Sequence, residues 1–164
     1  MHPSDVPLLA VPVGIGATAF MDLWLLALAR LGVPSSSFAL IGRWVGHMSH
    51  GRFVHASMAA AAPVRAELAL GWATHYAIGI AYAALLAALA GADWLQRPTP
   101  APALAFGLAT LAAPWLVMQP AMGAGVAASK TPAPWMNRLR SAANHAVFGL
   151  GLYLAASALA ALRG

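Results

Sequence analysis

Four apolar stretches, separated by segments that carry Lys or Arg, constrain the fold of this chain more than any other feature. They cover about residues 6–29, 68–92, 104–118 and 141–162. A bilayer core of roughly 30 Å is crossed by about 20 apolar residues of helix, and only the third stretch is short by that measure. The sequence therefore predicts an all-α polytopic membrane protein: one domain, built as a bundle of four transmembrane helices.

Charge is too sparse to cover a water-facing surface. Only 8% of the residues are charged and 61% are hydrophobic, whereas a soluble domain carries about 25% charged residues. The net charge of +5 comes from basic residues between the apolar stretches, a pattern that fits membrane orientation and not nucleic-acid binding. The absence of cysteine excludes disulfides, thiolate metal sites and cysteine nucleophiles.

The basic residues are distributed unevenly over the two sides of the predicted bundle. The first and third connections carry Arg30, Arg43, Arg52, Arg65, Lys130, Arg138 and Arg140, and the other side carries Arg97 and Arg163. Because basic loops stay in the cytoplasm, we predict a multi-pass protein of the cell inner membrane with both termini outside. Its partners are then the lipid bilayer and anionic headgroups at the cytoplasmic face, and its small size is compatible with a homodimer or a larger membrane complex.

The long first connection is not simply polar. Apolar residues recur there at helical spacing, and polar residues fall on another face. The apolar residues are Phe38, Ile41, Val45 and Met48, and the polar ones are Arg43, His47 and His50. This pattern predicts a short amphipathic helix on the cytoplasmic membrane surface, between spans one and two.

Three ionisable residues lie inside the predicted spans, where a charge costs roughly 2.5 kcal/mol or more. Asp22 precedes Arg30 by eight residues, His75 follows Glu67 by eight, and His145 follows Arg140 by five. At about 1.5 Å per residue, these separations place all three at depths of about 8 to 12 Å from the cytoplasmic boundary.

Small residues share the helix face of each ionisable group. The stripes are Gly14, Thr18 and Asp22; Gly71, His75 and Gly79; and Ser141, His145 and Gly149. Such stripes mark close helix–helix contacts, so we expect Asp22, His75 and His145 to point into the bundle and to share one interior site. The alternative is that each simply donates or accepts a hydrogen bond that fixes packing.

The leading hypothesis is a protein that binds or transports a small ligand through a cytoplasm-facing polar pocket. The expected ligand-binding residues are Asp22, Arg43, His47, Arg52, His55, His75, Gln119 and His145. A second hypothesis is a membrane-embedded enzyme or redox subunit in which His75 and His145 bind a transition metal or a haem. A third is a structural accessory subunit. The sequence leaves the ligand and any catalytic residue open.

Several short strings are similar to those of a known family of small bacterial four-helix membrane proteins. They are Gly42-Arg43-Trp44 with Gly46-His47, Gly51-Arg52-Phe53 with His55, Gly71-Trp72 with His75-Tyr76, Met118-Gln119-Pro120 with Gly123, and Phe148-Gly149 with Gly151 and Tyr153. The resemblance covers most of the chain, from about Met21 onward. The family is catalogued only as a domain of unknown function, so the resemblance implies a four-helix membrane fold and no activity.

Overall fold

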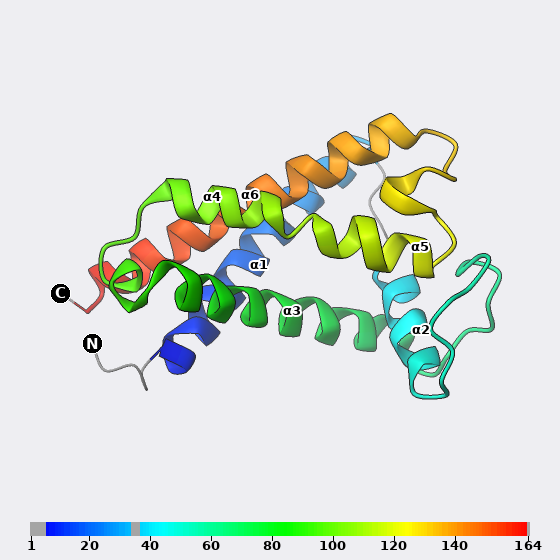
Figure 1. Ribbon diagram of the computed structural model, residues 1–164, viewed down its shortest axis with the longest axis horizontal. Helices are drawn as coiled ribbons and strands as arrows, with labels where there is room; N and C mark the ends of the chain where they lie inside the picture. Colours follow the sequence, from blue (N-terminus) through cyan, green and yellow to red (C-terminus); the bar gives the residue numbers. More distant parts are fainter. Residues whose placement is uncertain (1–5, 34–36, 164) are drawn as a thin grey trace. The chain divides into compact units, whose positions relative to one another are not determined.

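The computed structural model describes residues 6–33 and 37–163. All regular structure in these residues is helical (Figure 1). The elements are α1 (Val6–Arg30), α2 (Phe38–Met48), α3 (Glu67–Ala90), η2 (Ala92–Leu95), α4 (Pro100–Ala109), η3 (Pro114–Met118), α5 (Gln119–Ala121), η4 (Val126–Ala128) and α6 (Pro134–Ala161). Within the described residues, four helical segments are long and apolar enough to cross a membrane: Leu8–Arg30, Glu67–Ala90, Pro100–Ala121 and Pro134–Ala161. The predicted all-α membrane fold is therefore confirmed.

Two of these segments are longer than the apolar stretches in the sequence. The third begins at Pro100, because a proline in the first turn of a helix sacrifices no hydrogen bond. The fourth begins at Pro134, where Asn137 and Arg138 interrupt the apolar pattern without interrupting the helix. In both segments the extra residues at the start form the first turns of the helix, which hydropathy alone does not reveal.

The third apolar segment is broken in its middle. Helix α4 ends at Ala109, and the chain resumes as the π-helical turn η3, which begins at Pro114. Proline has no N–H to offer the carbonyl four residues back, and π-turns commonly accommodate such a defect. Pro114 therefore lies inside a span, Pro100–Ala121, that is longer than the predicted stretch of residues 104–118 and is interrupted.

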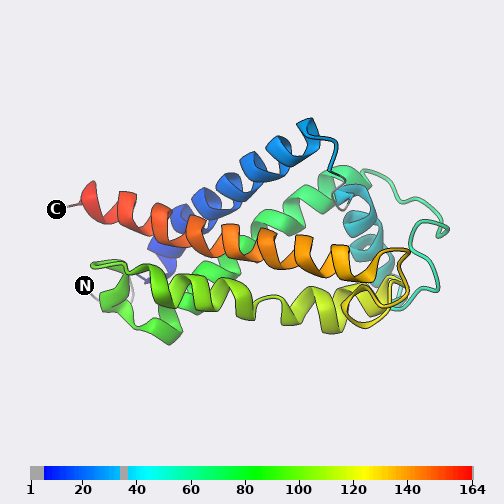
Figure 2. The same ribbon diagram turned by 90° about the horizontal axis from the view of Figure 1, so that it is seen from above.

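The chain divides into two compact units. Unit 1 comprises residues 1–33, 76–109 and 144–164, and unit 2 comprises residues 34–75 and 110–143. Unit 1 thus contains α1, α4 and the later parts of α3 and α6. Unit 2 contains α2, α5, the short turns η3 and η4, and the first turns of α3 and α6 (Figure 2).

Glycines allow the helices of unit 1 to cross closely. A Cβ added at Gly79 of α3 would overlap the Thr18 hydroxyl of α1, and one added at Gly14 would lie 2.8 Å from the Gly79 carbonyl oxygen. Gly107 of α4 and Gly149 of α6 meet in the same way, because a Cβ added at Gly107 would lie 2.6 Å from the Cα of Gly149. The expectation that small-residue stripes mark helix contacts is therefore confirmed for these positions.

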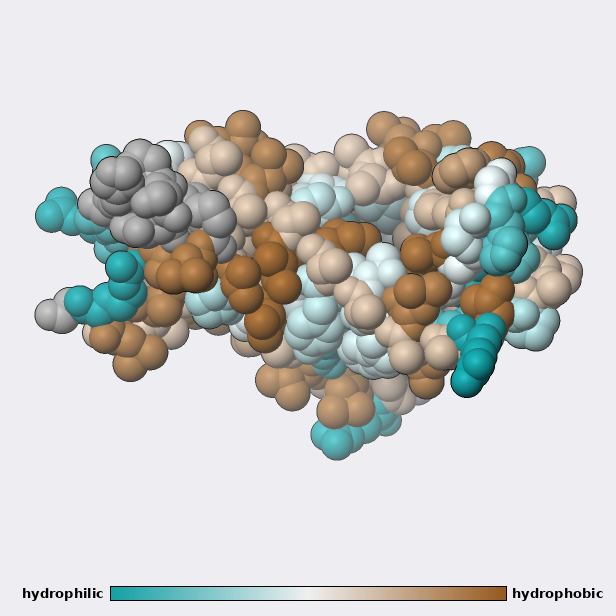
Figure 3. Space-filling model, turned by 90° about the horizontal axis from the view of Figure 1, so that it is seen from below, coloured by the Kyte–Doolittle hydropathy of each residue, from teal (hydrophilic) through white to brown (hydrophobic). Residues whose placement is uncertain are grey.

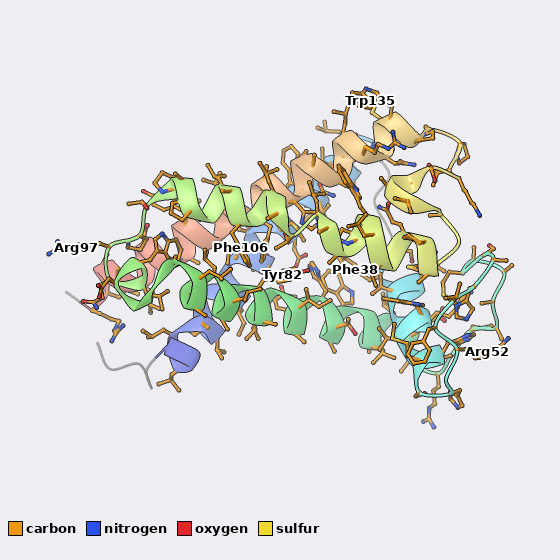
Figure 4. The ribbon with its side chains drawn as sticks, viewed as in Figure 1. Phe38, Arg52, Tyr82, Arg97, Phe106 and Trp135 are labelled. Atoms are coloured by element: carbon orange, nitrogen blue, oxygen red, sulfur yellow. The ribbon has the colours of Figure 1, made fainter. Side chains whose placement is uncertain are left out.

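The remaining core of unit 1 is apolar and aromatic. Val13 of α1 and Leu152 of α6 are buried in it. Tyr82 packs edge-to-face on Phe106, with ring centroids 6.0 Å apart (Figure 4). These contacts hold the spans together, while many large apolar side chains on the same helices, such as Leu23 and Leu89, remain exposed as lipid-facing residues would be.

Candidate functional site

Unit 2 is organised by a very close crossing of α2 and α3. A Cβ added at Gly42 would overlap the Glu67 carbonyl oxygen, and one added at Gly71 would overlap the Phe38 carbonyl oxygen. The two helix backbones are therefore in direct contact. This contact brings Arg43 of α2 beside Glu67, the first residue of α3.

Arg43 forms a two-pronged ion pair with Glu67. Its Nε and Nη2 atoms donate to the two carboxylate oxygens at 2.8 and 2.9 Å, and the hydrogen bond to Glu67 raises the pKa of Arg43. Nη1 also donates to the Ala61 carbonyl oxygen at 3.0 Å, with longer bonds to Met58 and Ala59. Arg43, predicted to bind ligand, thus ties the connection between α2 and α3 to both helices.

The end of α2 fixes the position of the next residues. Gly51 has a φ of +72°, its N–H donates to the Met48 carbonyl at 2.9 Å, and the Arg52 N–H donates to the His47 carbonyl at 3.1 Å. These two bonds define the Schellman motif that ends many helices. The chain consequently reverses at Gly51 and brings His55 back to His47.

His47 and His55 form a hydrogen-bonded pair. The Nδ1 atom of His47 lies 2.8 Å from Nε2 of His55, and Nε2 of His47 lies 2.9 Å from the Ala62 carbonyl oxygen. A carbonyl oxygen only accepts, so His47 Nε2 carries the proton. In the neutral pair, His47 Nδ1 is then an acceptor and His55 Nε2 is the donor. The second nitrogen of His55, Nδ1, must be an unprotonated acceptor.

The short distance identifies this pair as a hydrogen bond and not as two ligands of one metal. Two nitrogen ligands at about 2.0–2.1 Å from a tetrahedral zinc lie about 3.3 Å apart, whereas the observed separation is 2.8 Å. Within residues 6–33 and 37–163, no three His, Cys, Asp or Glu side chains are grouped so that they could hold a metal ion.

The surroundings of His55 favour its neutral form. Burial lowers the pKa of His55, and the nearby charges of His47 and Arg52 lower that pKa further. Its Nδ1 atom is buried and has no hydrogen-bond partner among the residues that the structure describes. The pair therefore ends in a buried basic nitrogen with an unused lone pair.

The end of the third apolar segment packs against His55. The His55 N–H donates to the Ala121 carbonyl at 2.8 Å, and a Cβ added at Gly123 would lie 2.9 Å from the His55 carbonyl oxygen. Two further buried polar atoms in this segment lack a partner within the described part of the chain: Gln119 Oε1 and Trp115 Nε1. Trp115 and Gln119 are one turn apart, so they share a helix face.

The intramembrane groups of unit 1 have partners of their own. Asp22 Oδ2 accepts a 2.8 Å hydrogen bond from the Tyr76 hydroxyl. His145 forms a hydrogen bond with the backbone of Gly107 in α4. Its neighbour Asn144 accepts a bond of 2.9 Å from the Trp24 indole. These contacts join helices, which is the packing role that the sequence left open as an alternative.

His75 belongs to unit 2 and lies among aromatic rings. Its ring centroid is 4.7 Å from that of Phe38 and 5.9 Å from that of Trp72. Because His75 and His145 belong to different units, a site shared by Asp22, His75 and His145 stays a prediction. The same holds for a metal or haem bound between the two histidines.

Six of the predicted ligand-binding residues belong to unit 2: Arg43, His47, Arg52, His55, His75 and Gln119. Of these, His47 and His55 are hydrogen-bonded and Arg52 lies near His55, whereas Arg43 binds Glu67. A role in ligand binding stays a prediction for all six. Trp115 is not among the predicted ligand-binding residues, because an aromatic residue in an apolar stretch normally indicates a core position or the membrane interface. Its spacing of four from Gln119 was the available signal.

One family pattern covers nearly the whole chain. The family described as "Protein of unknown function (DUF2938)" matches residues 11–159. The chain belongs to this family. The expected resemblance to a family of unknown function is thereby confirmed. No curated protein and no solved structure matches the chain, so the DUF2938 family supplies no substrate or catalytic residue and the site must be judged from its own chemistry.

Proposed function

We propose that this DUF2938 protein binds a small polar molecule in unit 2, at a site formed by His55, Gln119 and Trp115. The observation that carries the proposal is the set of three buried polar atoms without a partner in the described residues. Each such group costs about 1–3 kcal/mol when left unpaired. A ligand that pairs all three would recover that free energy.

The chemistry of the three atoms defines the ligand. His55 Nδ1 and Gln119 Oε1 are acceptors, and Trp115 Nε1 is a donor. The complementary group offers two N–H or O–H donors and one acceptor, as a primary carboxamide or a urea does. The hydrogen bond from His55 to His47 supports this assignment, because it holds His55 in the tautomer that accepts.

The location of the site supports access from one side of the membrane. Six of the nine Lys and Arg residues of the chain belong to unit 2: Arg43, Arg52, Arg65, Lys130, Arg138 and Arg140. By the positive-inside rule, we place unit 2 at the cytoplasmic face of a bacterial inner membrane, with both termini on the other side. Binding from the cytoplasm is then the first step of either sensing or transport.

The test uses acetamide as a probe and N,N-dimethylacetamide, which has no N–H donor, as its matched control. The protein is labelled with ¹⁵N-tryptophan in nanodiscs, and the indole resonances are followed during titration. We expect acetamide alone to shift the Trp115 resonance saturably. The indole of Trp94, which already donates to the Thr99 carbonyl at 3.2 Å, should not move.

Two substitutions complete the test. Gln119→Leu and His55→Phe each remove one acceptor, and each should weaken the acetamide response at Trp115 while leaving the Trp94 resonance in place. Equal responses to both amides, or no response at Trp115, would overturn the proposed site.

A structural role is the second function that a specific observation favours. The bonds of Asp22 to Tyr76 and of His145 to the Gly107 backbone each link two helices of unit 1. We propose that these residues fix the packing of the bundle. Substituting them should lower stability without changing the acetamide affinity of unit 2.

A further inference from the structure

The turn that follows α2 exposes two adjacent apolar side chains. Phe53 is 57% exposed and Val54 is 77% exposed, and both lie outside the four segments that are suited to cross a membrane. In water, such a pair would be an unfavourable hydrophobic surface. Phe53 and Val54 therefore need an environment other than bulk water.

This turn is held in place by three hydrogen bonds. The Schellman bonds of Gly51 and Arg52 fix its start, and the Trp44 indole of α2 donates to the Phe53 carbonyl at 2.8 Å. Helix α2 consequently determines where Arg52, Phe53 and Val54 are presented. A preorganised apolar turn of this kind binds without a large ordering cost.

The unit that carries the turn has a strongly positive charge balance. Arg52 itself is exposed (Figure 4). It directly precedes Phe53 in the chain. Unit 2 contains six Lys and Arg residues against one acid, Glu67, and that acid is already paired with Arg43. Basic and apolar groups side by side complement an anionic lipid headgroup and its acyl chain.

The position of the turn in the chain favours a bilayer as its partner. The connection that carries it leads directly into α3, which begins at Glu67 as a membrane-spanning helix. Figure 3 shows hydrophobic side chains exposed on the molecular surface alongside hydrophilic ones. A turn adjoining the start of a span lies within reach of the headgroup layer.

We propose that Phe53 and Val54 insert at the boundary between headgroups and acyl chains, while Arg52 binds the phosphate of an anionic lipid. This interaction is independent of ligand binding at His55. It anchors the connection between α2 and α3 to the membrane surface.

The absence of cysteine allows a direct test with single-cysteine variants. Phe53→Cys and Val54→Cys are labelled with a nitroxide and reconstituted in vesicles of phosphatidylcholine, alone or mixed with phosphatidylglycerol. Collision rates with oxygen, which partitions into lipid, and with a water-soluble nickel chelate report the depth of each label. His50→Cys, on the exposed polar start of the same turn, is the aqueous control, and Leu116→Cys, exposed within the third span, is the lipid control.

We expect the labels at residues 53 and 54 to collide more with oxygen than with nickel, as at residue 116, and the label at 50 to show the reverse. Phosphatidylglycerol should move the two labels deeper into the bilayer, and adding the substitution Arg52→Gln should remove this effect of the anionic lipid on label depth. Thermal unfolding of every variant is measured to check that its fold is intact. If labels 53 and 54 are as water-accessible as label 50, the bilayer proposal is wrong and the turn is better explained as a protein-docking surface. Equal depths in both lipid mixtures would overturn the role of Arg52.

Discussion

The crossing of α2 and α3 makes a quantitative prediction about Gly42→Ala. The new Cβ would overlap the Glu67 carbonyl oxygen and would also lie 2.6 Å from the Gly71 amide nitrogen, where ordinary contacts begin at 3.4 Å. The second contact alone requires the helices to separate by about 0.8 Å, and the overlap with Glu67 requires more. The Arg43–Glu67 hydrogen bonds, now 2.8 and 2.9 Å, would then stretch to at least about 3.6–3.7 Å, beyond the range of a hydrogen bond.

The matched control is Gly46→Ala on the same helix. Its Cβ would meet only side-chain atoms of Val64, with Cγ2 at 2.7 Å and Cβ and Cγ1 at 3.3 Å, so Val64 must shift but no helix backbone is in the way. Both substitutions gain a similar helix propensity, about 0.5–1 kcal/mol, which cancels in the comparison. Overpacking against backbone costs about 1–3 kcal/mol, so Gly42→Ala should be less stable than Gly46→Ala by that amount.

The assay is unfolding of the purified protein by added dodecyl sulfate in mild detergent, followed by tryptophan fluorescence. We expect the midpoint to fall further for Gly42→Ala than for Gly46→Ala. Equal midpoints for the two variants would refute the direct backbone contact of α2 and α3, and with it the placement of His47 in unit 2.

Three further predictions concern pH, packing and topology. The pKa of His55 is lowered from 6.5 in the folded protein. Below about pH 6.5 the unfolded state therefore binds a proton that the folded state does not bind, and the folded protein loses stability as the pH falls. His55→Gln should flatten this fall in the unfolding midpoint between about pH 8 and about pH 5. Tyr76→Phe removes the hydrogen bond to Asp22 and should cost about 0.6 kcal/mol, measured by the same unfolding assay, whereas Tyr82→Phe should cost less. A reporter fused after Gly164 should be active only outside the cytoplasm, and cytoplasmic activity there would contradict the proposed orientation.

The sequence predicted those elements whose signals are local. The bounds of α2, Phe38–Met48, follow from its apolar spacing and from Gly51, which supplies the left-handed residue that ends it. The start of α6 at Pro134 was not predicted, because Asn137 and Arg138 make its first turns polar and hydropathy cannot register them.

The site was predictable in part for the same reason. His47 and His55 flank a short reversal, so their proximity follows from one turn of chain. The segment that carries Trp115 and Gln119 is joined to His55 by the hydrogen bond from the His55 N–H to the Ala121 carbonyl, and nothing in the local pattern specifies that contact. The partner of Arg43, Glu67, likewise depends on how closely Gly42 and Gly71 allow two helices to approach.

The most direct test of the account is side-chain ¹⁵N NMR of histidine-labelled protein in nanodiscs at neutral pH, with His55→Gln used to assign the resonance. The hydrogen bonds of His47 to Ala62 and to His55 predict that His55 carries its proton on Nε2. Its Nδ1 should be unprotonated and should be the histidine nitrogen that shifts when acetamide is added. A proton on His55 Nδ1, or an Nδ1 resonance unaffected by acetamide, would contradict the proposed ligand site.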